Sequence, residues 1–195
     1  PSVFALLNQQ KPNLKTGMFY DWDWLGTFVN KKYISKEKYT TGFKTVTPLA
    51  IDFIKTSKPA FTFIYYGHPD EVGHEMGFNT KAYYSAINEV DSEIGRIIEA
   101  LKEAEMYEKT TLIIVSDHGG IEFGHGGESM VELEVPFIIS GPGIKKNVVL
   151  EKSNDLINIA PTIAGILGLT PPHEWTGRRI QEAFMSKIKS TASIK

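Results

Sequence analysis

Cysteine is absent from the 195 residues, so the chain has no disulfide bond, no cysteine-ligated metal centre and no cysteine nucleophile. Long hydrophobic runs are also missing, because no stretch approaches the roughly 18 consecutive apolar residues that a membrane span needs. Charge of one sign is not in excess: 21 Lys and Arg stand against 23 Asp and Glu, which gives a formal net charge of −2. This balance argues against a nucleic-acid polymer or an acidic membrane surface as a partner.

A starting methionine and a secretion signal are missing from the first residues, which read Pro1-Ser2-Val3. We therefore expect a chain that is mature or trimmed at its N-terminus. The hydrophobic fraction of 42% and the charged fraction of 23% are those of a globular protein. The length favours a single domain, 1–195.

Apolar patterning predicts strands and helices that alternate along the chain. Strands are expected at 15–21, 60–66, 111–116 and 135–140, the last three as continuous apolar runs. Helices are expected at 1–10, 45–57, 79–107 and 153–168, with Pro48 in the first turn of the second and Asn79 as the cap of the third. Loops are expected at 22–44, with one helical turn, and at 67–78. A short helix after Gly177 and a frayed tail at 186–195 complete the expectation.

The order strand, helix, strand over residues 60–116 predicts a parallel crossover, because parallel strands need a long connection between them. We therefore expect an α/β fold with a mostly parallel central sheet flanked by helices.

Aspartate and histidine side chains follow two of the predicted strands. Asp70 and His74 follow the second strand in the sequence GHPDEVGH, and Asp117 and His118 follow the third in DHGG. His125 comes next, between two glycines. Ligands of open α/β sheets bind outside the carboxyl ends of the strands, and a catalytic zinc site takes three imidazole or carboxylate ligands. The pattern predicts a metal site made of Asp70, His74 and His125.

Each part of this pattern also has a purely structural interpretation. Asp117 is of the kind that caps a backbone amide in a turn, and His125 alone is compatible with a solvated loop. His68 is expected to support its neighbours, and His173 to be structural. A G-x-S-x-G elbow, a P-loop and a G-x-G-x-x-G motif are all missing from the sequence.

The combined motifs resemble the alkaline phosphatase superfamily, in its branch of nucleotide pyrophosphatase/phosphodiesterase-like and sulfatase-like hydrolases. The resemblance covers about residues 60–180. It rests on YGHPDEVGH with Gly77, on SDHGG, on GHG around His125, on VPFIISGPG and on DLINIAPTIAGILG.

This resemblance implies a metal-dependent phosphoester hydrolase of phosphodiesterase or phosphatase type, acting on a small-molecule phosphoester through two zinc ions and a phospho-enzyme. Asp70, His74 and His125 would hold one Zn²⁺ ion, while Asp117 and His118 would hold the other. Mn²⁺ is the less expected metal. The two ions of such sites lie roughly 3.5–4 Å apart and clamp the attacking and leaving oxygens. Relatives of this kind also favour an exported protein.

The family's Thr or Ser nucleophile and its first metal-binding aspartate are expected upstream of residue 1. Asp21 and Asp23 form an acidic cluster near the N-terminus, with no hydroxyl nucleophile in the family's relation to it. We therefore expect the chain to be the C-terminal portion of a longer metallo-hydrolase, inactive or nearly so by itself. A sheet that lacks one strand exposes an edge, so self-association through that edge is a further expectation.

Three alternatives remain open: a sulfatase-type hydrolase, a metal-dependent phosphomutase and an inactive metal-binding module. Phosphomutases of this superfamily, usually manganese-dependent, typically continue Asp-His-Gly with Asn, whereas this chain has Gly120. A sulfatase would need a formylglycine upstream of residue 1, and the histidine-rich ligand set favours two zinc ions over a single calcium ion.

Overall fold

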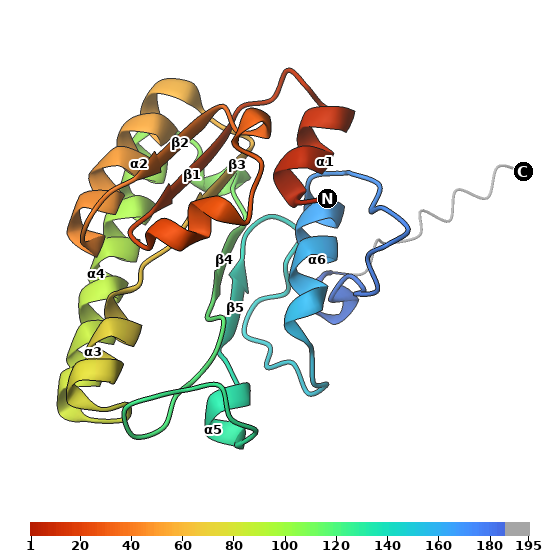
Figure 1. Ribbon diagram of the computed structural model, residues 1–195. Coiled ribbons are helices and arrows are strands. Elements are labelled where there is room, and N and C mark those ends of the chain that lie inside the picture. Colours follow the sequence, from red (N-terminus) through yellow and green to blue (C-terminus); the bar gives the residue numbers. More distant parts are fainter. Residues whose placement is uncertain (186–195) are drawn as a thin grey trace, which may run out of the picture.

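A computed structural model describes residues 1–185 of the chain, and the tail expected at 186–195 lies outside them. Helices α2 (Phe43–Ser57) and α4 (Lys81–Glu103) cover one side of a parallel sheet, while α1 (Val3–Gln10) and α6 (Ile159–Ile166) lie on the other side of the molecule (Figure 1). The structure confirms the expected α/β class with helices flanking a parallel sheet.

Strand β1 (Thr16–Tyr20) is the centre of a three-stranded parallel sheet in the order β2-β1-β3. All five of its residues are buried, which fits its apolar sequence TGMFY. Strand β3 (Phe61–Ile64) corresponds to the run expected at 60–66. Strand β2 (Lys36–Tyr39) falls in the expected loop, so that expectation was wrong there. Its sequence KEKY carries no apolar alternation, and the charged side chains suit the edge of a sheet.

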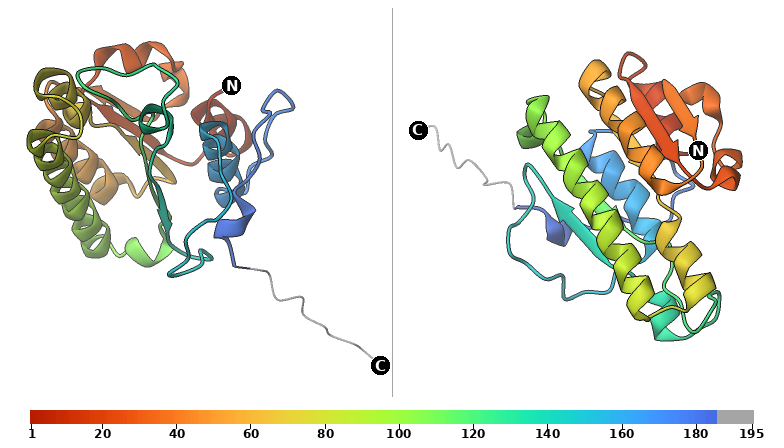
Figure 2. Two further views of the ribbon diagram at one scale, coloured as in Figure 1. Left: turned by 90° about the horizontal axis from the view of Figure 1, so that it is seen from below. Right: turned by 90° about the vertical axis from the view of Figure 1, so that its left-hand side faces the viewer.

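Strands β4 (Leu112–Val115) and β5 (Phe137–Ser140) form a separate antiparallel pair. Among the described residues, hydrogen-bonded ladders join β3 only to β1 and β4 only to β5, so the expected parallel crossover does not close into one sheet. Figure 2 shows the β4–β5 pair between the side that carries α3 (His68–Met76) and α4 and the side that carries α1 and α6. One edge of β3 and one edge of β4 are therefore left without a partner strand in residues 1–185.

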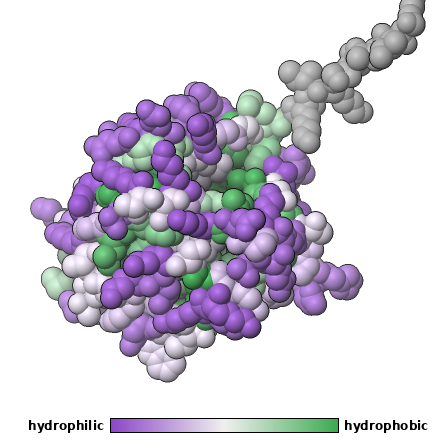
Figure 3. Space-filling model, turned by 90° about the horizontal axis from the view of Figure 1, so that it is seen from above, coloured by the Kyte–Doolittle hydropathy of each residue, from purple (hydrophilic) through white to green (hydrophobic). Residues whose placement is uncertain are grey.

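Apolar side chains on these strands remain exposed. Phe63, Val115 and Ile138 are 36%, 38% and 56% exposed, although their strands are apolar runs of the kind usually buried on both faces. Apolar patches among hydrophilic residues are visible on the face seen in Figure 3. Strands with such apolar sequences are usually covered on both faces, and residues 1–185 leave part of these faces uncovered.

Two helices begin at other residues than the sequence predicts, and capping explains the start of the second. Helix α2 begins at Phe43, so Pro48 lies inside the helix and not in its first turn. Helix α4 begins after Thr80, whose side chain accepts the backbone N–H of Tyr83, so Thr80 and not Asn79 is the cap. Asn79 has a positive φ of 61°, which suits the turn before the cap.

Short elements complete the chain. They are α5 (Met130–Leu133) and the 3₁₀ turns Asp23–Thr27, Lys31–Tyr33, Tyr107–Lys109, Leu156–Asn158 and Gln181–Ala183. The last of these takes the place of the short helix expected after Gly177. Within residues 1–185, no helix is both long enough and apolar enough to cross a membrane.

Candidate metal centre

Asp70 and His74 lie one turn apart on helix α3 (His68–Met76), which follows β3. The Gly, His, Pro and Asp residues of 67–78 predict a loop here, and that prediction was wrong. Pro69 near the start and the acidic residues Asp70 and Glu71 in the first turn are nevertheless helix-start signals. The helical i, i+4 spacing places Asp70 and His74 on the same face.

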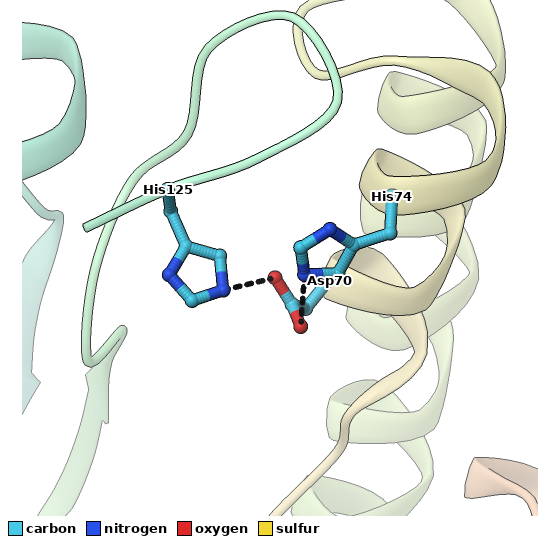
Figure 4. Close-up of side chains that lie close together, drawn as sticks. All are labelled: Asp70, His74 and His125. Carbon is cyan, nitrogen blue, oxygen red and sulfur yellow. Dashed lines mark ion pairs between the residues drawn. The ribbon is translucent and has the colours of Figure 1, made fainter. Parts of the chain in front are cut away.

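The three residues predicted to bind metal come together (Figure 4). Nε2 of His74 is 3.4 Å from Oδ2 of Asp70, and Nε2 of His125 is 3.6 Å from Oδ1 of the same carboxylate. One ligand atom from each residue lies within 4.8 Å of the others. Ligands about 2.0–2.1 Å from a tetrahedral zinc ion are about 3.4 Å apart, so the side chains are near the spacing that one ion requires.

Hydrogen bonding leaves lone pairs facing one another in this group. Nδ1 of His74 is 2.8 Å from the carbonyl oxygen of Phe123, which only accepts, so Nδ1 carries the proton and donates it. Nε2 of a neutral His74 therefore presents a lone pair toward Asp70. Oδ1 of Asp70 is buried and has no hydrogen-bond partner within residues 1–185. Such an arrangement is unfavourable unless a cation or a proton lies between the groups, and it fits a divalent metal ion.

Asp117 and His118 follow β4 and lie beside this group. Nε2 of His118 is 3.8 Å from Oδ2 of Asp117, and Nδ1 of His118 donates to the carbonyl of Gly119 at 2.9 Å. Oδ1 of Asp117 also accepts the backbone N–H of His118, as the turn interpretation anticipates. The rings of His118 and His125 are stacked, with centroids 3.7 Å apart and planes 19° apart. The predicted second pair thus adjoins the first three residues.

In the described part of the chain, no third metal-binding side chain completes a set with Asp117 and His118. Of residues 1–185, only Asp70, His74 and His125 form a group of three metal-binding side chains. The structure brings all five predicted residues to one region, and it provides a three-residue set for one ion alone.

The two glycines that follow His118 allow close packing. A Cβ atom on Gly119 would lie 2.0 Å from the carbonyl oxygen of Val131, and one on Gly120 would lie 2.3 Å from the ring of Phe78. The same ring lies 2.5 Å from the Cβ position of Gly73 on α3. Phe78 therefore wedges between the helix that carries Asp70 and the turn that carries Asp117.

A small pocket of about 70 Å³ lies beside the candidate ligands. Its lining includes Tyr65, Tyr66, Tyr83, Asp70, Asp117 and His118. Burial, helped by the charges of Asp117 and Asp70, raises the pKa of Tyr65, and burial raises that of Tyr66 to about 12. Both hydroxyls are therefore neutral donors at neutral pH. Sequence reasoning did not assign these tyrosines to the site, although Tyr65 and Tyr66 directly follow β3 and precede the segment that carries Asp70.

Two other histidines lie outside the group. The ring of His68 stacks on Phe43, with centroids 4.0 Å apart and planes 12° apart, and its Nε2 is 3.9 Å from Oε1 of Glu89. This packing matches the supporting role expected for His68. His173 is exposed in the C-terminal part of the described chain.

Several known proteins resemble the chain in sequence or in fold. The family model for type I phosphodiesterase / nucleotide pyrophosphatase matches residues 9–174. The 2,3-bisphosphoglycerate-independent phosphoglycerate mutase of Gloeobacter violaceus is 35% identical over 161 residues, covering 77% of this chain and 29% of that protein. Arylsulfatase K of Bos taurus is 32% identical over 118 residues, covering 58% and 22%.

A putative sulfatase from Bacteroides thetaiotaomicron shares the fold, with a TM-score of 0.64 and 15% identity over 97% of this chain and 57% of that one. A 2-O GAG sulfatase gives a TM-score of 0.63 and 13% identity over 94% and 56%. The chain spans less than a third of the length of the phosphoglycerate mutase and of arylsulfatase K.

Proposed function

Because the chain belongs to the type I phosphodiesterase / nucleotide pyrophosphatase family of the alkaline phosphatase superfamily, we propose that it carries the metal ligands of a hydrolase that acts on a small-molecule phosphoester. The convergence of Asp70, His74 and His125 supports this proposal most directly. These residues come from a helix and a loop far apart in the sequence. Nε2 of His74 lies toward the carboxylate of Asp70, and the buried Oδ1 of that carboxylate has no hydrogen-bond partner among the described residues.

Zinc is the metal that we assign to the site. Asp70, His74 and His125 would hold one ion, and Asp117 and His118 would contribute to a second. Two imidazoles and one carboxylate suit zinc, whereas manganese prefers oxygen ligands. When bound, such a cation polarises a phosphoryl oxygen and activates a hydroxyl or water nucleophile.

The side chains around the ligands orient them. The carbonyl of Phe123 fixes the proton of His74 on Nδ1, and the carbonyl of Gly119 does the same for His118, so both residues present Nε2 as the free nitrogen. The stacked ring of His118 limits rotation of His125. These contacts hold both imidazoles in the tautomer that a metal ion requires.

The nucleophile and a further ligand for Asp117 and His118 are proposed to lie in a part of the protein outside these residues. The chain covers only 29% and 22% of two curated relatives, which leaves ample sequence for them. Ser116 is the serine in the pocket lining, and its hydroxyl donates to the carbonyl of His118 at 2.8 Å, so we do not assign it as the nucleophile. Because we assign no nucleophile within these residues, we expect residues 1–195 alone to be inactive or nearly so.

A metal-dependent phosphomutase is the second candidate. Several curated relatives that are 33–36% identical over about three quarters of this chain are named phosphoglycerate mutases. Gly120, where such mutases typically have Asn, favours the hydrolase, and its close contact with Phe78 gives the glycine a structural reason.

The test uses the whole polypeptide that contains residues 1–195, loaded with Zn²⁺ or Mn²⁺. Turnover of a chromogenic phosphodiester is compared with turnover of a phosphomonoester and a sulfate ester, and with isomerisation of a phosphoglycerate. We expect phosphoester hydrolysis that Asp70→Asn abolishes and His173→Ala leaves unchanged. Preference for the sulfate ester or the phosphoglycerate would replace the hydrolase by a sulfatase or a mutase. Absence of any metal-dependent turnover would leave a metal-binding module.

We also propose that the chain self-associates through its free strand edges. One edge of β3 and one edge of β4 have no partner strand within residues 1–185, and exposed apolar side chains lie on β3 (Phe63), β4 (Val115) and β5 (Ile138). Exposed apolar strand edges pair readily with other chains, and a second copy of this chain offers the same edges.

A further inference from the structure

The N-terminus of α3 is held by a side chain from a different element. Asp21 directly follows β1, and its Oδ1 accepts the backbone N–H of Gly67 at 2.8 Å in a buried hydrogen bond. Gly67 is the residue that precedes α3, and it has no side chain with which to cap the helix. Asp21 thus binds, from the end of β1, the backbone N–H of the capping position, which in a capping box is bound by a side chain of the helix itself.

The buried carboxylate of Asp21 is energetically unfavourable at this position. It is only 8% exposed, and its Oδ2 is buried without a hydrogen-bond partner in the described residues. Burial raises its pKa, and the neighbouring carboxylate of Glu71 acts in the same direction. A buried carboxylate with an unpaired oxygen destabilises the fold, and the positive end of the α3 dipole offsets only part of this cost. Packing alone therefore gives no reason for a buried polar acceptor here.

The position of Gly67 determines the position of the ligands. Asp70 and His74 follow Gly67 within the first two turns of α3, so movement of the helix N-terminus carries both side chains with it. Metal sites tolerate errors of about 0.2 Å in ligand distance, and catalytic groups must be held within about 0.5 Å. A single hydrogen bond at the start of this short helix is therefore well placed to control the site.

We infer that Asp21 is a positioning residue of the metal centre, whose carboxylate fixes Gly67 and thereby the placement of Asp70 and His74. This inference rests on the metal site proposed above. It assigns no metal contact to Asp21, which acts through the backbone of α3.

The experiment measures zinc affinity in the whole polypeptide by competition with a chromophoric chelator, for the wild type and four variants. Asp21→Ala removes the acceptor, Asp21→Asn keeps an acceptor without the charge, and Asp21→Glu keeps the charge but moves the acceptor. Asp23→Ala is the matched control, because it removes an exposed carboxylate two residues away from Asp21. We expect zinc affinity to fall about tenfold or more in the Ala and Glu variants, as for other residues that orient metal ligands. The Asn and control variants should bind like the wild type.

Amide hydrogen exchange at Gly67 provides a second readout that needs no metal. We expect exchange to accelerate in Asp21→Ala and Asp21→Glu and to stay slow in Asp21→Asn. If Asp21→Ala does not fold, the comparison of the Glu and Asn variants decides. Equal zinc affinity in all variants would overturn the inference, and so would equal losses in the Asn and Glu variants. If the wild type itself binds no zinc, the proposed metal site fails, and the inference fails with it.

Discussion

The ring of Phe78 occupies the space that a side chain on Gly120 would need, since a Cβ atom there would lie 2.3 Å from Cδ1 of the ring. The ring also lies 2.5 Å from the Cβ position of Gly73. Phe78 itself is buried, with 7% of its surface exposed. One aromatic side chain thus requires glycine on both segments that carry candidate metal ligands.

Gly120→Ala is therefore expected to destabilise the protein by about 1–3 kcal/mol, as overpacking in a close-packed interior does. Urea unfolding followed by circular dichroism measures the change. Gly95→Ala is the matched control, because Gly95 lies inside α4 with nothing within 4 Å of its Cβ position. That variant should gain about 0.5–1 kcal/mol from helix propensity. Equal effects of the two substitutions would contradict the idea that the ring of Phe78 requires glycine at position 120.

Sequence patterns predicted the elements whose hydrophobic pattern is contained in their own residues. The apolar runs predicted β3, β4 and β5, and the long amphipathic stripe predicted α4. The motifs around Asp70, His74 and His125 predicted that these residues meet, because strand ends and their loops gather at one edge of a sheet. Their role as ligands stays a prediction.

The remaining features depend on contacts between distant segments. Strand β2 carries the sequence KEKY and becomes a strand only because β1 offers it a parallel edge. Helix α3 has no apolar stripe, so periodicity did not reveal it, although Pro69 and its acidic neighbours did mark its start. The partners of His74 and of Asp21 are a backbone carbonyl and a backbone amide, groups that every residue has and no motif marks.

His125→Ala should lower zinc affinity, whereas His173→Ala should not. His125 contributes one of the three converging ligand atoms, and its loss leaves Asp70 and His74 with an incomplete set. Because even residues behind the ligands are worth about 10–100-fold in affinity, loss of a ligand should cost at least about tenfold. Titration with zinc against a chelator gives the affinities. Similar losses in both variants would remove His125 from the ligand set.

Asp21→Asn should make stability less dependent on pH. The folded-state pKa of Asp21 is raised, first by burial, so the folded state binds this proton more tightly than the unfolded state. Its contribution to stability is therefore fully present below the unfolded-state pKa and is lost as pH rises through the folded-state pKa. Asparagine does not titrate, so the variant should gain stability relative to the wild type as pH rises. Urea unfolding between about pH 3.5 and pH 7 tests this, and a stability difference that shrinks as pH rises would contradict it.

Self-association should depend on the exposed apolar side chains of β3 and of the β4–β5 pair. Sedimentation of the purified chain is expected to show a mass that rises with concentration, because both strand sets keep an edge without a partner within residues 1–185. Ile138→Lys places a charge on β5, where the side chain is 56% exposed, and should shift the chain toward the monomer. Val149→Lys is the control, since Val149 is 88% exposed outside the strands. A concentration-independent monomer would refute self-association, and equal effects of the two lysines would attribute it to surface hydrophobicity in general.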